Sequence, residues 1–116
     1  MRHFKFILAV VLSAFVLLLI VPSPTVASTE PGALFQNKCA VCHGRDGLAN
    51  TPLGRKESIP SFVSDKVRRT SPADLTDFIL YGGKEKKASH SFANKGISQD
   101  DALQLATYIK ALGRKK

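Results

Sequence analysis

Apolar residues recur at helical spacing in three segments of the chain, which lie near residues 29–38, 71–82 and 98–113. Ser71 and Ser98 precede the second and third segments as helix caps, and each has an aspartate three residues later. Gly82 and Gly113 follow these segments and predict where the two helices end. No stretch alternates apolar and polar residues as a strand would. The pattern therefore predicts an all-α domain with three main helices.

The first segment predicts a helix that begins at Thr29 or Glu30, with Pro31 at an early position where a missing N–H costs nothing. Its apolar side chains and those of the other two segments are the expected core. These core candidates are Leu34, Phe35, Leu75, Phe78, Ile79, Ala102, Leu105, Ala106, Ile109 and Leu112.

Two long loops separate the predicted helices. Residues 44–65 are rich in glycine, proline and serine, and residues 84–96 are rich in lysine. Loops of this length in a small domain usually wrap around something. The inward-facing candidates of the first loop are Leu48, Leu53, Ile59 and Phe62.

Residues 1–28 have the composition of a secretory signal peptide. Arg2 and Lys5 precede an apolar run from Ile7 to Val21, and small residues follow it. The run is about fifteen residues long, shorter than the roughly 20 that a bilayer span needs, which favours a cleaved signal over an uncleaved N-terminal anchor. We expect a mature domain of residues 29–116 in the periplasm, or anchored to the membrane and facing the periplasm if the signal is retained.

The size and charge of this domain narrow its function. About 88 residues bury too little apolar surface to make a domain clearly stable, so a covalent cross-link or a cofactor is expected. The chain has 17 basic and 9 acidic residues and a formal net charge of +8. Such a charge attracts acidic partners or an anionic membrane face. Export and the lack of a recognisable binding motif argue against nucleic acid.

Cys39, Cys42 and His43 form a Cys-x-x-Cys-His motif, the attachment signature of c-type haem. A three-residue offset on one helical turn places both sulfurs on one side, where they can bond the two haem vinyl groups, and His43 then reaches the iron. A thioredoxin-like disulfide is expected near a strand–helix–strand unit, which the pattern lacks. A zinc site normally needs four ligands, and only one cysteine pair is present. The motif therefore predicts one covalently bound haem, which also supplies the missing core.

The second axial ligand is less obvious. The only methionine is Met1, and His43 and His90 are the only histidines after residue 28. His90 is the candidate ligand. The alternatives are an iron without a sixth protein ligand, or ligation by one of the lysines of the second loop, which are Lys84, Lys86, Lys87 and Lys95.

From residue 31 to residue 112 the sequence resembles the class I cytochromes c. Four features carry the resemblance: Phe35 four residues before Cys39, the Cys-x-x-Cys-His motif, the Leu105-x-x-Tyr108 pair, and a helix after Ser71 that ends in glycine. In that family the Leu-x-x-Tyr pair packs across the first helix. The resemblance implies the class I cytochrome c fold, with three main helices and wrapping loops around one haem.

The family usually has methionine as the distal ligand, and placing His90 at that position puts Ser98 at the cap of the last helix, as the family requires. Ser91 stands where proline is usual, and Phe92 comes one residue before the usual aromatic. The resemblance thus implies a low-spin haem with two histidine ligands. Because methionine ligation raises the reduction potential, a lower potential is expected here.

The resemblance also implies further haem contacts. A loop proline of the family turns its carbonyl oxygen toward the proximal histidine, and Pro52 is the best match. Arg45 or Arg55 is a candidate partner for a haem propionate. The expected walls of the haem pocket are Leu53, Phe62, Phe78 and Ile79.

With both axial positions filled, the implied function is one-electron transfer by a monomeric carrier that is not an enzyme. Its partners would be redox proteins, some with acidic docking surfaces, and it would contact a membrane only if the N-terminal segment is uncleaved. Two alternatives stay open. One is a haem-based sensor or gas-binding protein in which His90 dissociates, with peroxidase-like activity following from the same open position, and the other is a subunit of a larger respiratory complex.

Overall fold

The computed structural model describes residues 1, 3–5, 7 and 29–115 of the chain. The predicted signal peptide lies almost entirely outside the described residues, so it stays a prediction. Within the described residues, no helix is both long enough and apolar enough to cross a bilayer.

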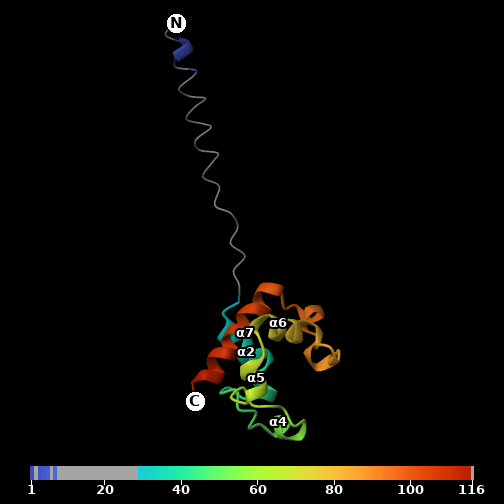
Figure 1. The fold of residues 1–116 in the computed structure, drawn as a ribbon. Helices are drawn as coiled ribbons and strands as arrows, with labels where there is room; N and C mark the ends of the chain where they lie inside the picture. Colours follow the sequence, from blue (N-terminus) through green and yellow to red (C-terminus); the bar gives the residue numbers. More distant parts are fainter. Residues whose placement is uncertain (2, 6, 8–28, 116) are drawn as a thin grey trace.

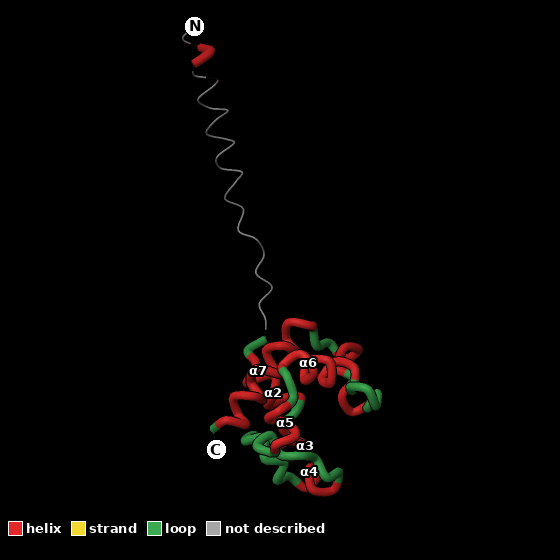
Figure 2. The backbone as a smooth tube through the Cα atoms, viewed as in Figure 1, coloured by secondary structure: helices red, strands yellow, loops and turns green. Residues whose placement is uncertain are grey.

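Residues 29–115 fold into helices joined by loops, with no strand among the described residues (Figure 1, Figure 2). This confirms the all-α prediction. The α-helices are α2 (Pro31–Lys38), α3 (Ala40–His43), α4 (Pro52–Lys56), α5 (Asp65–Arg69), α6 (Pro72–Tyr81) and α7 (Gln99–Arg114), and two 3₁₀ turns, η1 (Ala88–His90) and η2 (Phe92–Lys95), follow α6.

The core forms where α2 crosses α7. Phe35 of α2 is fully buried, and its ring lies 5.4 Å from the ring of Tyr108 and 5.9 Å from that of Phe62, measured between centroids. Leu105, one turn from Tyr108, is also fully buried. The predicted packing of the Leu-x-x-Tyr pair across the first helix is therefore confirmed. Helix α6 packs along α7, and Ile79 and Leu80 complete the core.

The helix boundaries agree closely with the sequence signals. Glu30 accepts hydrogen bonds from two backbone N–H groups at the start of α2, and Ser71 accepts one at the start of α6. Gly82 ends α6 in the left-handed conformation, at φ 77°. Ser98 and Asp101 form a complete capping box at the start of α7, because the shorter aspartate still reaches the Ser98 N–H.

Helix α7 differs from the prediction at its C-terminal end, since it continues past Gly113 to Arg114. Gly113 is needed here for close packing: a Cβ atom added to it would lie 2.6 Å from the carbonyl oxygen of Phe62. The glycine therefore lets the first loop pack against the last turn of α7, and it does not end the helix.

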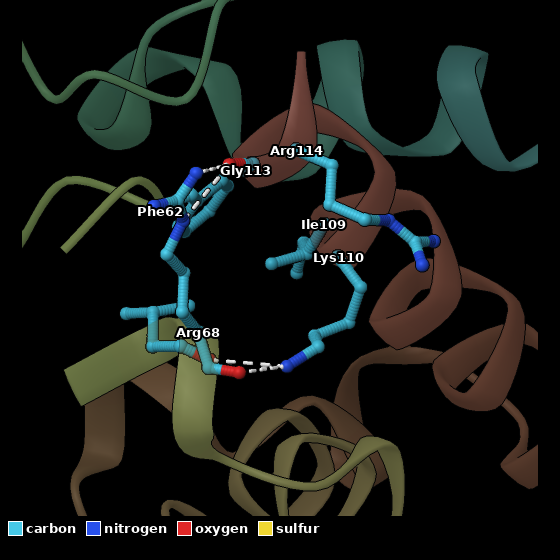
Figure 3. Close-up of a pocket in the computed structure, with 7 residues that line it drawn as sticks. Phe62, Arg68, Ile109, Lys110, Gly113 and Arg114 are labelled. Carbon is cyan, nitrogen blue, oxygen red and sulfur yellow. Dashed lines mark hydrogen bonds between the residues drawn. The ribbon is translucent and has the colours of Figure 1, made fainter. Parts of the chain in front are cut away.

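Apolar periodicity did not reveal two short helices, α4 within the first loop and α5 directly after it. Leu53, expected to face inward, is 37% exposed on α4, because a helix of five residues at the surface turns this position toward solvent. Helix α5 is attached to α7 by two basic side chains (Figure 3). Arg68 donates to the carbonyl oxygen of Gly113, and the Lys110 ammonium donates to carbonyl oxygens at the end of α5. A pocket of about 330 Å³ lies between these two helices.

Candidate functional site

The Cys-x-x-Cys-His motif lies on a helical turn, as its spacing predicts. Cys39 ends α2 and begins α3, and its carbonyl oxygen accepts a hydrogen bond of 3.0 Å from the His43 N–H. Both cysteines are half-buried, and neither forms a disulfide. The turn thus carries two thiols and one imidazole along one short stretch of chain.

The Cys39 thiol does not have the electrostatics of a redox-active cysteine. Burial, with a smaller contribution from Cys42, raises the pKa of the Cys39 thiol to about 11. Reactive thiols and zinc-bound thiolates are found where the pKa is lowered, not raised. The described residues also hold no cluster of three or more potential metal-binding side chains of the usual His, Cys, Asp or Glu kind. The raised pKa of Cys39 therefore disfavours a redox-active disulfide, and the small number of candidate ligand side chains disfavours zinc.

His43 is held against the core. Its ring stacks on Phe62 with centroids 4.8 Å apart and planes 28° apart, and Phe62 in turn contacts Phe35. Burial lowers the pKa of His43 to about 4, with a further contribution from His90. The imidazole is neutral at physiological pH, which is the form that binds a metal ion.

The structure brings His90 to the same place from a distant part of the chain. Its ring centroid lies 5.9 Å from that of His43, with an angle of 66° between the planes. Phe78 of α6 contacts the His90 ring at 4.6 Å, and Phe92 lies 6.4 Å away. Burial lowers the pKa of His90, and the nearby Lys87 and Lys95 charges lower it further. His90 is therefore also neutral.

The spacing of the two imidazoles fits a metal ion between them. With metal–imidazole bonds of about 2.0 Å, two imidazoles whose ring centroids are about 6 Å apart could bind one ion between them. The observed 5.9 Å agrees with this value. The Nδ1 atom of His43 is buried and has no hydrogen-bond partner among the described residues, while Nδ1 of His90 lies 3.2 Å from the Ser89 hydroxyl. These residues fit a haem iron with two histidine ligands.

Residues 27–109 match the protein family described as cytochrome c oxidase, cbb3-type, subunit III. The chain belongs to the class I c-type cytochromes. No curated protein and no solved structure matches the chain. Proteins of this family have an all-α cytochrome c fold, which this chain shares, and they bind haem and transfer electrons. The family also implies covalently bound haem c.

Two of the predicted pocket residues lie next to the histidines of the cytochrome. Phe62 is 6% exposed and contacts His43, and Phe78 contacts His90. Ile79 belongs to the core, and Leu53, Arg45 and Arg55 are exposed.

The predicted hydrogen bond from His43 to the carbonyl oxygen of Pro52 is not made, since His43 Nδ1 has no partner among the described residues. Pro52 is exposed at the first position of α4. Its neighbour Thr51 makes the connection to the motif, because its hydroxyl donates to the carbonyl oxygen of Cys42 at 2.8 Å and accepts from the Gly54 N–H. A threonine before proline is a helix-cap signal, so the sequence does indicate that Thr51 caps α4. The same capping hydroxyl makes a contact with the haem motif, whereas such a contact was expected of Pro52.

The lysines considered as iron ligands have other contacts or face solvent. Lys95 donates to the carbonyl oxygen of Ala88, and Lys87 pairs with Glu85. Lys84 and Lys86 are exposed. In this arrangement His90 is the side chain that lies opposite His43.

Proposed function

We propose that this cytochrome is a monomeric one-electron carrier, not an enzyme, with one haem bonded covalently to Cys39 and Cys42 and its iron held between His43 and His90. The observation that carries the proposal is the 5.9 Å separation of the two imidazole rings. Both histidines are neutral and half-buried, and Phe62 stacks on His43 while Phe78 contacts His90. No other described histidine lies in the folded domain.

The chemistry supplied by the bound group is a one-electron change between ferric and ferrous iron, with the electron taken from a reduced donor protein and given to an oxidised acceptor. The protein's own residues make and break no bond in this process. Two histidine ligands leave no open position for a substrate, which favours outer-sphere transfer. The motif lies close to the surface, where Val41 between the cysteines is 67% exposed, so a partner can approach it closely.

The partners we propose are redox proteins with acidic docking surfaces. Residues 82–97, which include His90, contain four exposed lysines, and Glu85 is the only acidic residue among them. Such a surface speeds encounter with an acidic protein at low ionic strength. The rate of electron transfer to an acidic partner should therefore fall as salt rises. The location we propose is the periplasm, in keeping with the signal-like residues 1–28.

The matched family is described as an oxidase subunit, and the same carrier chemistry would serve within a complex. Copurification of the tagged protein from solubilised membranes separates the two cases. A free carrier elutes alone as a monomer, whereas a subunit elutes with other proteins in fixed proportion.

The decisive test of the ligand set is the absorption spectrum of the holoprotein beside His90→Ala and His90→Met. The native protein should be low-spin and should lack the methionine-to-iron charge-transfer band at about 695 nm. His90→Ala should become high-spin or bind added imidazole, and His90→Met should gain the band and a higher reduction potential. An unchanged low-spin spectrum in His90→Ala would exclude His90 as the ligand.

A redox titration tests the same proposal independently. The native potential should lie below that of His90→Met, because a second imidazole favours the ferric state relative to a thioether ligand. Rapid binding of carbon monoxide to the native ferrous protein would instead support the sensor alternative. Slow binding, limited by release of His90, supports the carrier.

A further inference from the structure

The segment that carries His90 packs on α6 through both η1 and η2, but its backbone hydrogen bonds join near neighbours in sequence. His90 ends η1, and Phe92 begins η2 with only Ser91 between them. The backbone bonds are local: the His90 N–H donates to Lys87, and the Ile97 N–H donates to Phe92. These bonds define each turn separately and do not connect η1 to η2.

Lys95 does connect the two turns. Its side chain starts at the end of η2, and its ammonium donates to the carbonyl oxygen of Ala88 in η1 at 3.3 Å. The same ammonium lies 4.9 Å from the centroid of the Phe92 ring, within range of a cation–π contact. One cation therefore contacts residues on both sides of His90.

Phe92 transmits this contact to the histidine. Its ring lies 6.4 Å from that of His90, with the planes 76° apart. Phe78 of the core-packed helix α6 lies 4.6 Å from His90. The imidazole thus contacts two aromatic rings, one of which lies on α6, while the other packs against the core and is covered by the Lys95 ammonium.

We propose that Lys95 is a positioning residue for His90. Lys95 joins η1 to η2 and so slows the dissociation of His90 from the iron, the step that lets a small neutral ligand bind in its place. The proposal rests on the proposed function, since it requires His90 to be an iron ligand. It goes further by naming the side chain that sets how fast the sixth position opens.

The test uses the ferrous holoprotein mixed with carbon monoxide at saturating concentration, where the binding rate equals the rate of His90 release. Lys95→Met removes the ammonium and keeps the length of the side chain. It should release His90 about three- to tenfold faster, as expected for loss of one cation–π contact and one hydrogen bond. Lys95→Arg, which retains both kinds of contact, should restore a rate close to that of the native protein.

The matched control is Lys84→Met, which removes the same charge from an exposed position in the same loop. Its release rate should stay within about twofold of the native rate, since exposed charges interact weakly. Equal rates for Lys84→Met and Lys95→Met would overturn the proposal, and so would an absence of carbon monoxide binding to Lys95→Met. A lowered thermal midpoint of Lys95→Met with an unchanged release rate would indicate a purely structural role and would also overturn it.

The spectrum of His90→Ala separates this proposal from the proposed function. If His90→Ala loses the low-spin spectrum but Lys95→Met releases His90 at the native rate, only the positioning role of Lys95 fails. If His90→Ala keeps the native spectrum, His90 is not the ligand and both proposals fail.

Discussion

The two histidines of the site are supported in very different ways. His43 lies on the proximal side, which we define as α2, α3, α7 and Phe62, and its ring stacks on a side chain that is part of the core. His90 lies in the distal segment, residues 82–97, where short turns and exposed lysines surround it. His90 contacts Phe78 of α6, and Phe92 and Ile97 of the same segment also pack against or within the core.

This difference determines how easily each histidine moves when neighbouring residues are changed. A residue fixed by interlocking buried rings moves only when the core opens, whereas a turn held by local bonds and long exposed side chains opens at lower cost. Cys39 and Cys42 are on the proximal side as well. The fold therefore makes His43 part of the domain's stability and leaves the position of His90 to be adjusted by a few residues.

The largest expected difference between the two sides comes from removing the aromatic ring next to each histidine. Phe62→Ala deletes a buried ring that contacts both His43 and Phe35, and should lower the free energy of unfolding by about 3–5 kcal/mol. Phe92→Ala deletes a half-buried ring next to His90 and should cost about 1 kcal/mol. Urea unfolding of the holoproteins, followed by circular dichroism, measures both values.

The rate of carbon monoxide binding is a second way to compare the two sides. Phe92→Ala should accelerate carbon monoxide binding while the protein remains folded. Equal losses of unfolding free energy in the two variants would show that the distal segment is as firmly packed as the proximal side, contrary to our interpretation.

The next prediction concerns close packing at Gly113. Gly113→Ala places a methyl group 2.6 Å from the Phe62 carbonyl oxygen, and the clash should cost about 1–3 kcal/mol, partly offset by about 1 kcal/mol of better helix propensity. A shift of Phe62 should also change the environment of His43.

The control for this change is Gly96→Ala in the distal segment. An added Cβ there meets no atom within 4 Å, and only the left-handed φ of 81° opposes the substitution, at about 1 kcal/mol. Thermal unfolding ranks the two variants. If Gly113→Ala is about 1 kcal/mol more stable than the native protein, the full gain of helix propensity without a clash, the approach of the first loop to α7 is not tight.

The main helices and most of the proximal side were predictable because local signals agree with tertiary packing there. Ser71, Ser98 and Gly82 act as the caps that their sequence context predicts, and Phe35, Leu105 and Tyr108 meet at the helix crossing. In these regions the residue that specifies local structure also serves the core, so one pattern carries both kinds of information.

The loops were less predictable because short elements lack periodicity. Leu53 resembled a core residue, yet one turn of α4 exposes it, and Pro52 starts that turn with no hydrogen bond to His43. The attachments of α5 depend on Lys110 and Arg68, long side chains that bond backbone oxygens far away in sequence. Nothing in the local sequence of a lysine indicates such a partner.

A smaller effect is expected from removing the Lys110 ammonium, which satisfies backbone oxygens at the end of α5. It donates to the carbonyl oxygen of Thr70 at 2.9 Å and also to those of Val67 and Arg68. Lys110→Met should cost about 1–2 kcal/mol, because these carbonyls lose a charged donor. Lys115→Met, at an exposed position close to the same end of α7, should cost less than about 0.5 kcal/mol. Urea unfolding of both variants tests this, and equal losses would contradict a specific role for Lys110.

The smallest effects should come from the two exposed ion pairs, one in each part of the domain. Lys87 and Glu85 in the distal segment lie 3.1 Å apart, and Arg69 and Asp65 on α5 lie 3.0 Å apart. Glu85→Gln and Asp65→Asn should each change the unfolding free energy by less than about 0.5 kcal/mol, since exposed pairs are well screened.

Glu85→Gln should also leave the rate of His90 release nearly unchanged, because the bond from Lys95 to Ala88 remains intact. Calorimetry and carbon monoxide binding measure the two quantities. A much faster release in Glu85→Gln would mean that surface charge, and not Lys95, holds the distal segment in place. Small and equal effects of the two substitutions would instead place the difference between the two histidines in the packing of Phe62, Phe78 and Phe92.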